Sequence, residues 1–155
     1  MFKSVNELDK LNFDDCVLTG IEKAEDGIIF NAEALIIKAN NSQNENFTES
    51  YAGSSQIKFE KGAVKSEIKC GYKYYNADGK LLKELPDEPV AVPEWGSIFK
   101  SFEGNYLPCL DIEEGLYTAE IEMAEADGQG DSYLIKIEAE NVIVTWEKYL
   151  NRVSR

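Results

Sequence analysis

Histidine is missing from the 155 residues of this chain, which removes the commonest general base and the commonest metal ligand of proteins. Catalysis by a Ser-His-Asp or Cys-His arrangement is therefore excluded, and a structural metal site is not expected. Cysteine is scarce and odd in number: Cys16, Cys70 and Cys109 are widely spaced and form no Cys-x-x-Cys motif. This pattern predicts free, mostly buried thiols in a reducing compartment.

Long apolar runs are missing as well, and no stretch approaches the roughly 20 residues that cross a bilayer. The first fifteen residues are too acidic and polar for a secretion signal. We therefore expect a cytoplasmic protein. No glycine-rich loop stands between a strand and a helix, so a nucleotide is not expected, and the sequence indicates no other cofactor.

Basic residues are few, with 16 against 29 acidic residues and a net charge of −13. A nucleic acid or an anionic membrane would be repelled, so we expect neither as a partner. The charged residues are unevenly distributed along the chain. Residues 58–83 hold seven lysines and three acids, whereas nine acids and no base lie between Lys100 and Lys136. If these segments lie apart in the fold, their separation creates a negative pole that steers a basic protein partner; if their strands are neighbours, the charges offset one another.

Alternation of apolar and polar residues is the main structural signal, and it is longest over residues 63–75. We interpret this stretch as a central strand with Val64, Ser66 and Ile68 on the buried face. Asp78-Gly79 then predicts a hairpin turn. Similar patterns predict a strand pair over residues 13–23 and 28–38, and another over 116–123 and 132–139, where Tyr117 and Ile121 point inward.

Two short helices are predicted. Ser4-Val5-Asn6-Glu7 matches a capping box and predicts a helix over residues 4–11. Pro93 opens a second helix, in which Trp95, Ile98, Phe99 and Phe102 form one apolar stripe that plugs an open end or edge of the sheet. Residues 40–50 are expected to form a polar surface loop anchored by Phe47.

Together these elements predict a mainly β fold, an antiparallel sandwich or partly open barrel of about eight strands with one or two short helices. With 43% hydrophobic residues, the chain is long enough for one domain spanning residues 1–155. Residues 151–155 are expected to be a frayed tail.

Aromatic residues provide the clearest hint of a site, because tyrosine and tryptophan are over-used at binding surfaces. The candidate binding residues are Tyr72, Tyr74, Trp95, Tyr106, Glu120 and Glu122. The competing interpretation places the aromatic residues in an ordinary core and the two glutamates on a solvated strand face.

Three chemical interpretations have weaker support. Paired carboxylates such as Glu120 and Glu122 could perform acid/base hydrolysis. Cys109 has apolar neighbours and no histidine to activate it, so we interpret it as a structural thiol. Residues 127–131 resemble a calcium turn but lack the spacing of an EF-hand, and an exposed acidic loop fits them better. We therefore expect neither a catalytic residue nor a metal ligand.

The leading hypothesis is a non-catalytic interaction protein whose acidic surface binds a basic protein partner. Its small, acidic, motif-poor composition resembles that of some immunity proteins that block a toxin, a resemblance that transfers no site. The alternative is a small-molecule-binding β-barrel with an aromatic-lined mouth, and a carboxylate-based hydrolase is third. A filled interior favours the first hypothesis, and a concave aromatic cavity on the order of 300–1,000 Å³ favours the second. The oligomeric state stays open.

Overall fold

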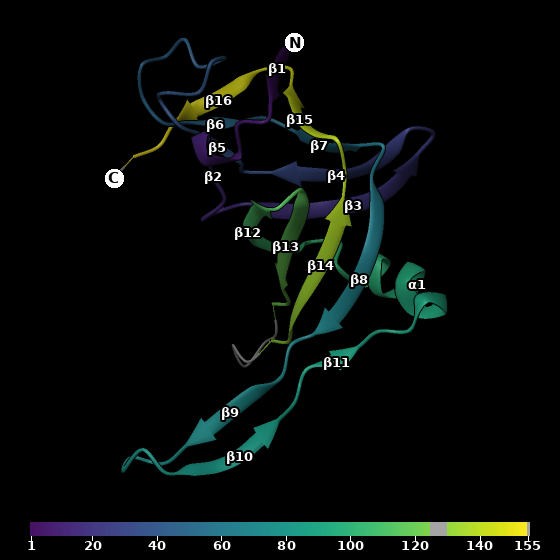
Figure 1. Cartoon of the computed structure of the whole chain (residues 1–155). Helices are drawn as coiled ribbons and strands as arrows, with labels where there is room; N and C mark the ends of the chain where they lie inside the picture. Colours follow the sequence, from purple (N-terminus) through teal and green to yellow (C-terminus); the bar gives the residue numbers. More distant parts are fainter. Residues whose placement is uncertain (125–129, 155) are drawn as a thin grey trace.

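Ten antiparallel strands form one strongly bent sheet in the computed structural model, which describes residues 1–124 and 130–154 (Figure 1). The first half of the sheet contains, in spatial order, β1 (Phe2–Val5), β15 (Asn141–Trp146), β7 (Ser55–Glu60), β4 (Gly27–Glu33) and β3 (Val17–Ala24). The second half continues with β12 (Asn105–Glu113), β13 (Leu116–Glu122), β14 (Ser132–Glu138), β8 (Ala63–Lys69) and β11 (Glu88–Pro89).

The two halves meet where β3 pairs with β12, through Leu18 opposite Asn105 and Val17 opposite Tyr106. Figure 1 shows β3, β4 and β7 running steeply across β13, β14 and β8, as in an orthogonal sandwich. The predicted single domain of mainly antiparallel β structure is confirmed, and the sheet does not close into a barrel.

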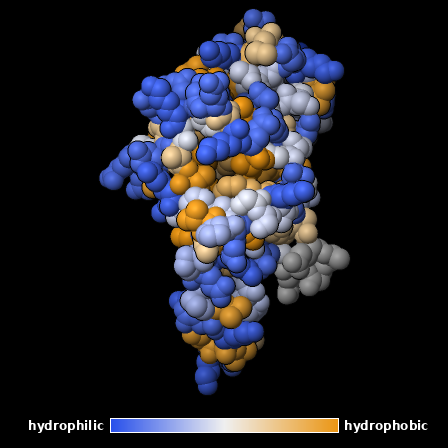
Figure 2. All heavy atoms as spheres, turned by 90° about the vertical axis from the view of Figure 1, so that its right-hand side faces the viewer, coloured by the Kyte–Doolittle hydropathy of each residue, from blue (hydrophilic) through white to orange (hydrophobic). Residues whose placement is uncertain are grey.

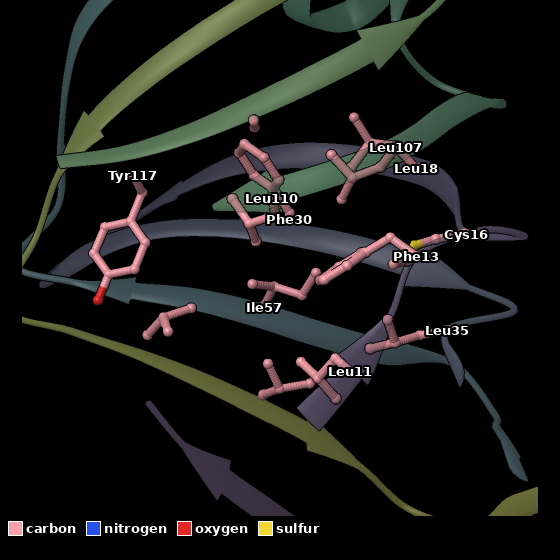
Figure 3. Packing of buried hydrophobic residues seen from close by; sticks show 14 of the residues in the cluster. Leu11, Phe13, Cys16, Leu18, Phe30, Leu35, Ile57, Leu107, Leu110 and Tyr117 are labelled. Atoms are coloured by element: carbon pink, nitrogen blue, oxygen red, sulfur yellow. The ribbon is translucent and has the colours of Figure 1, made fainter. Parts of the chain in front are cut away.

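The core fills the space between these two layers (Figure 3). From the first layer, Leu18, Phe30 and Ile57 are fully buried. The Phe59 ring lies 5.0 Å from Phe30 and 5.4 Å from Tyr117 of the second layer, measured between ring centroids. Burial of such side chains supplies the main favourable free energy of folding.

Strand β8 departs from the predicted face assignment. Its register against β14 shifts between Lys136 opposite Ser66 and Ile137 opposite Val64, which leaves Lys65 as the extra residue of a β-bulge. A shift of one residue moves every later side chain to the other face. Glu67 is consequently buried opposite Ile135, and Ile68 is only partly buried. The prediction that Ile68 lies in the core was wrong.

The hairpin of β13 and β14 matches its prediction. Tyr117 pairs with Ile137 and Ile121 with Tyr133, and all four side chains are buried in the core. The preceding strand β12 was missed. Pro108 lies inside β12, at the register shift between Tyr106 and Cys109, which is one of the positions where a sheet tolerates proline.

The predicted N-terminal helix was wrong. Ser4 does bond to Glu7, with Oγ and Oε1 2.8 Å apart, but Ser4 belongs to β1 and pairs with Val144. Only a 3-10 turn, η1 (Leu8–Lys10), follows. Asn6 has a φ of 54°, a left-handed conformation that interrupts helical geometry.

The second predicted helix is present as η2 (Val92–Glu94) followed by α1 (Trp95–Ser101). Phe102, just after α1, is fully buried, and Ile98 and Phe99 pack partly buried against the core. The Phe102 ring lies 5.1 Å from that of Tyr133 on β14. The helix therefore plugs the sheet by its apolar stripe, as predicted.

A small second sheet contains β16 (Tyr149–Arg152), β6 (Ser50–Ala52), β5 (Ile36–Ile37) and β2 (Leu11–Asn12). Residues 151–153, expected in a frayed tail, are paired here: Arg152 lies opposite Ser50, and the Val153 N–H donates to the Glu49 carbonyl at 3.0 Å.

The loop between β5 and β6 is not anchored by Phe47, whose side chain is 91% exposed. The buried Asn41 and the partly buried Asn44 organise it instead. The Asn44 amide donates to the carbonyls of Ile37, Lys38 and Thr48, and the Asn41 amide donates to the Ser4 hydroxyl at 3.1 Å. Such amides satisfy backbone groups that no strand partner reaches.

We predict that Phe102→Ala lowers the free energy of unfolding by about 3–5 kcal/mol, because it removes a fully buried ring. Lys100→Ala, an exposed change two residues away, should cost less than about 0.5 kcal/mol. Chemical denaturation measures the free energy of unfolding of both variants. Similar decreases in the two would contradict the packing of the apolar stripe of α1 and Phe102 against the sheet.

Candidate functional site

The six candidate binding residues do not form one site. Tyr72 and Tyr74 lie on a projecting hairpin, Trp95 begins α1, and the remaining three lie on β12 and β13. The structure brings together Tyr72 with Tyr74, whose rings are 5.2 Å apart, and Tyr106 with Glu122, which are opposite residues of adjacent strands. The four aromatic candidates therefore lie on three separate parts of the fold.

The projecting hairpin, called the arm, spans residues 71–86 and contains β9 (Tyr72–Tyr75) and β10 (Leu81–Leu85). Figure 1 shows the arm extending away from the two layers beyond β8 and β11. Every residue of both strands is exposed. The large apolar side chains among them are Tyr72, Tyr74, Tyr75, Leu81, Leu82 and Leu85. Figure 2 shows hydrophobic atoms gathered on the lower end of the molecule, where the arm lies.

Cross-strand pairs order the arm. Tyr74 lies opposite Lys83, whose ammonium is 6.0 Å from the ring centroid, and Lys73 forms an ion pair with Glu84 at 3.6 Å. Leu85 lies opposite Tyr72. One face of the arm thus presents two tyrosines, a leucine and a lysine, and tyrosine is one of the residue types enriched at interfaces.

The base of the arm is tightly built around Gly71. A Cβ at this position would lie 1.9 Å from the Leu85 carbonyl oxygen, so only glycine fits. The Gly71 N–H donates to Asp87 Oδ1 at 2.7 Å, and β11 then rejoins the body with Glu88 opposite Lys69. These contacts fix the direction in which the arm leaves the body.

The hairpin of β12 and β13 carries the acidic surface of the protein. Asp111, Glu113, Glu114 and Glu122 are exposed, Glu120 is partly exposed, and none of the five forms an ion pair with a described residue. Tyr106 is 44% exposed beside Glu122. Glu120 and Glu122 lie on the outer face of β13, away from the buried Ile121. This matches the interpretation of the two glutamates as a solvated strand face, the alternative to a pair of catalytic carboxylates.

The lysines of β8 and the arm do not offset this acidic surface. Lys65 pairs with Glu138 and Lys69 with Asp131, both at 3.6 Å and both on or beside β14. Lys73 pairs within the arm. The charges thus offset one another between β8 and β14, while β13, one strand further, stays uncompensated. Exposed pairs of this kind contribute little stability, but they decide where negative charge remains.

The three cysteines are free thiols. Burial raises the pKa of Cys16 to about 12. Burial and then the hydrogen bond to Asp111, with Sγ and Oδ2 3.1 Å apart, raise the pKa of Cys109 to about 11. Burial also raises the pKa of Cys70. All three thiols therefore stay protonated at neutral pH, as expected of structural cysteines.

A groove of about 660 Å³ opens between α1 and the ends of β3, β4 and β8. Its apolar lining includes Ile21, Ile28, Val64, Trp95 and Phe99. The Trp95 and Phe99 rings are stacked with centroids 6.5 Å apart, and the Trp95 indole N–H donates to the Val90 carbonyl at 2.9 Å. Figure 2 shows apolar atoms exposed in the middle of the face that carries α1. Trp95 is the one predicted site residue that lines this groove.

Glu67 was not predicted as unusual. Its side chain is 1% exposed, and neither carboxylate oxygen has a hydrogen-bond partner among the described residues. Burial raises its pKa to about 8, so the group is mostly neutral at pH 7. A perturbed carboxyl can mark a functional site, but Glu67 is not among the residues that line the groove.

Comparisons with models of known families, with curated protein sequences and with solved structures each found no significant match to this chain.

Within residues 1–124 and 130–154, no cluster of three or more cysteines or carboxylates is arranged to hold a metal ion. The candidate calcium turn at residues 127–131 falls largely outside the described residues. No helix in the described part of the chain is long and apolar enough to cross a membrane.

We predict that stability falls as the pH rises from about 4.5 to about 8, because the unfolded chain releases the Glu67 proton at the lower value and the folded chain at the higher one. The contribution is on the order of a few kcal/mol. Glu67→Gln, which keeps the shape and removes the titration, should flatten this slope. Urea unfolding at several pH values measures it.

Glu122→Gln is the matched control, because it removes an exposed carboxyl from the same layer. Its stability should follow the wild-type pH profile. A Glu67→Gln variant with the same slope as the wild type would contradict the assignment of a neutral, buried carboxyl.

Proposed function

We propose that this chain is a non-catalytic interaction protein that binds a basic protein partner and engages it with the arm. The observation that carries the proposal is the exposure of every strand residue of the arm, including three tyrosines and three leucines. Exposed apolar side chains gathered on one projecting element commonly mark interaction sites. Tyrosine is also enriched among residues that dominate binding energy.

The charge balance argues for a basic partner. Residues 71–86 contain three lysines and two acids, a net charge of +1, so the rest of the chain carries −14. The field of the body therefore outweighs that of the arm. The uncompensated carboxylates of β12 and β13 add a local negative surface, which would attract cationic side chains and accelerate association.

The fitting partner has an apolar cleft for the arm and a cationic surface around it. The arm reaches such a cleft without moving the body, because its base is fixed at Gly71 and Asp87. A contact made by a pre-ordered hairpin loses less conformational entropy than one made by a flexible loop.

Free thiols accord with a reducing compartment, and we place the interaction in the cytoplasm.

Affinity capture with matched variants tests the proposal. The arm variant combines Tyr74→Ser and Leu82→Ser, and the control is Phe47→Ser, an exposed apolar residue outside both the arm and the acidic hairpin of β12 and β13. We expect the wild type and the control to capture the same basic protein, and the arm variant to lose it. Both arm residues are solvent-exposed, so the thermal midpoint of the variant should stay close to that of the wild type.

The purified pair then provides the decisive measurement. We expect the arm variant to weaken binding by roughly a hundredfold, as loss of two contact residues near an interface centre allows. The association rate should fall steeply with added salt. Equal affinity of the arm variant and the control, or an acidic partner with a salt-independent rate, would contradict the proposal.

A further inference from the structure

The groove beside α1 is a second concave feature, separate from the arm. It lies where the two layers of the sandwich diverge, with Ile21 and Ile28 on one wall and Val64 on another. The ring stack of Trp95 and Phe99 forms the wall contributed by α1. A volume of about 660 Å³ falls within the range of small-molecule sites, which are mostly apolar with a few charged groups at the edge.

Four charged residues border the groove: Glu22, Lys23, Lys100 and Glu103. Successive side chains of a strand point to opposite faces. Ile21 pairs with the buried Phe30 and Lys23 with the buried Ile28, so both project toward the interior side, whereas Glu22 projects to the outer face.

The two lysines at the groove are not neutralised by an ion pair within the described part of the chain. Neither Lys23 nor Lys100 forms an ion pair with any described residue, although several other lysines of this acidic chain do. Strand alternation directs the Glu22 side chain outward, which leaves Lys23, Lys100 and Glu103 as the charged side chains on the groove side. Their net charge is +1 in a protein of net charge −13.

We infer that the groove binds a small amphipathic anion, with its apolar body against Trp95, Phe99 and Val64 and its anionic group between Lys23 and Lys100. Burial of the apolar body would provide most of the affinity, because the lining is mainly hydrophobic. The two lysines would make an anionic head group preferred over a neutral or cationic one. Their contribution to the binding free energy would be smaller than that of the apolar body, because charge contacts that are partly exposed to solvent are weak. This site is independent of the arm, so its failure would leave the proposed function unaffected.

Three probes with the same ten-carbon tail test the inference: decanoate, decanol and decylammonium. Binding is followed by nuclear magnetic resonance through the indole N–H signal of Trp95, assigned with a Trp95→Phe variant. We expect decanoate to bind roughly tenfold more tightly than decanol, as two partly screened charge contacts allow, and decylammonium to bind most weakly. Absence of a shift with every probe, or equal affinity for decanoate and decanol, would overturn the inference.

Matched variants locate the two parts of the site. Lys23→Gln combined with Lys100→Gln should remove the preference for decanoate and leave decanol binding unchanged, whereas Lys136→Gln on β14 should change neither. Gly96→Leu should weaken all three probes, because a side chain added at Gly96 meets open space at the groove lining. A double lysine variant that still prefers decanoate would refute the charge assignment, and undiminished binding by Gly96→Leu would refute the location.

Discussion

The packing of Phe59 between the two layers is the contact on which the shape of this protein depends. Backbone pairing joins the halves of the sheet along a short seam, in which Leu18 lies opposite Asn105, Val17 lies opposite Tyr106, and the Leu107 N–H donates to the Cys16 carbonyl at 3.0 Å. So short a seam does not by itself fix their relative orientation. The Phe59 ring instead touches Phe30 in its own layer and Tyr117 in the other. Because the layers cross steeply, they diverge beyond this contact, and α1 with its groove occupies the opening.

Hairpins and faces could be predicted wherever alternation runs without interruption. The pairing of β13 with β14 and the inward direction of Tyr117 and Ile121 follow from period-two patterns. The apolar stripe of α1 follows from helical spacing in the same way. In contrast, the face of β8 depends on a bulge at Lys65 that has no local sequence signal. The extra residue makes an apparently buried Ile68 point outward and an apparently exposed Glu67 point inward.

The candidate site was harder to predict, because its residues depend on contacts between distant segments. Tyr72 and Tyr74 continue the alternation of β8, so they were assigned to the same strand, whereas the chain leaves the body at Gly71. The signal that could have indicated a separate hairpin is the short spacing from Gly71 through Asp78-Gly79 to Pro86. Trp95 was correctly singled out, but the strands that complete its groove are more than thirty residues away in sequence.

The ends of the sheet indicate how the arm would make contact with a partner. An open sheet edge invites another strand to pair with it, but β11 at one end has two residues and includes Pro89, which cannot donate a backbone hydrogen bond. On the arm itself, Lys73 and Lys83 place charged side chains on both strands, a feature that opposes unspecific pairing. The backbone is thus poorly suited to strand addition, while the tyrosine and leucine side chains stay available. Recognition through the arm would therefore depend on side-chain insertion into a shaped cleft, which discriminates among partners more sharply than backbone pairing does.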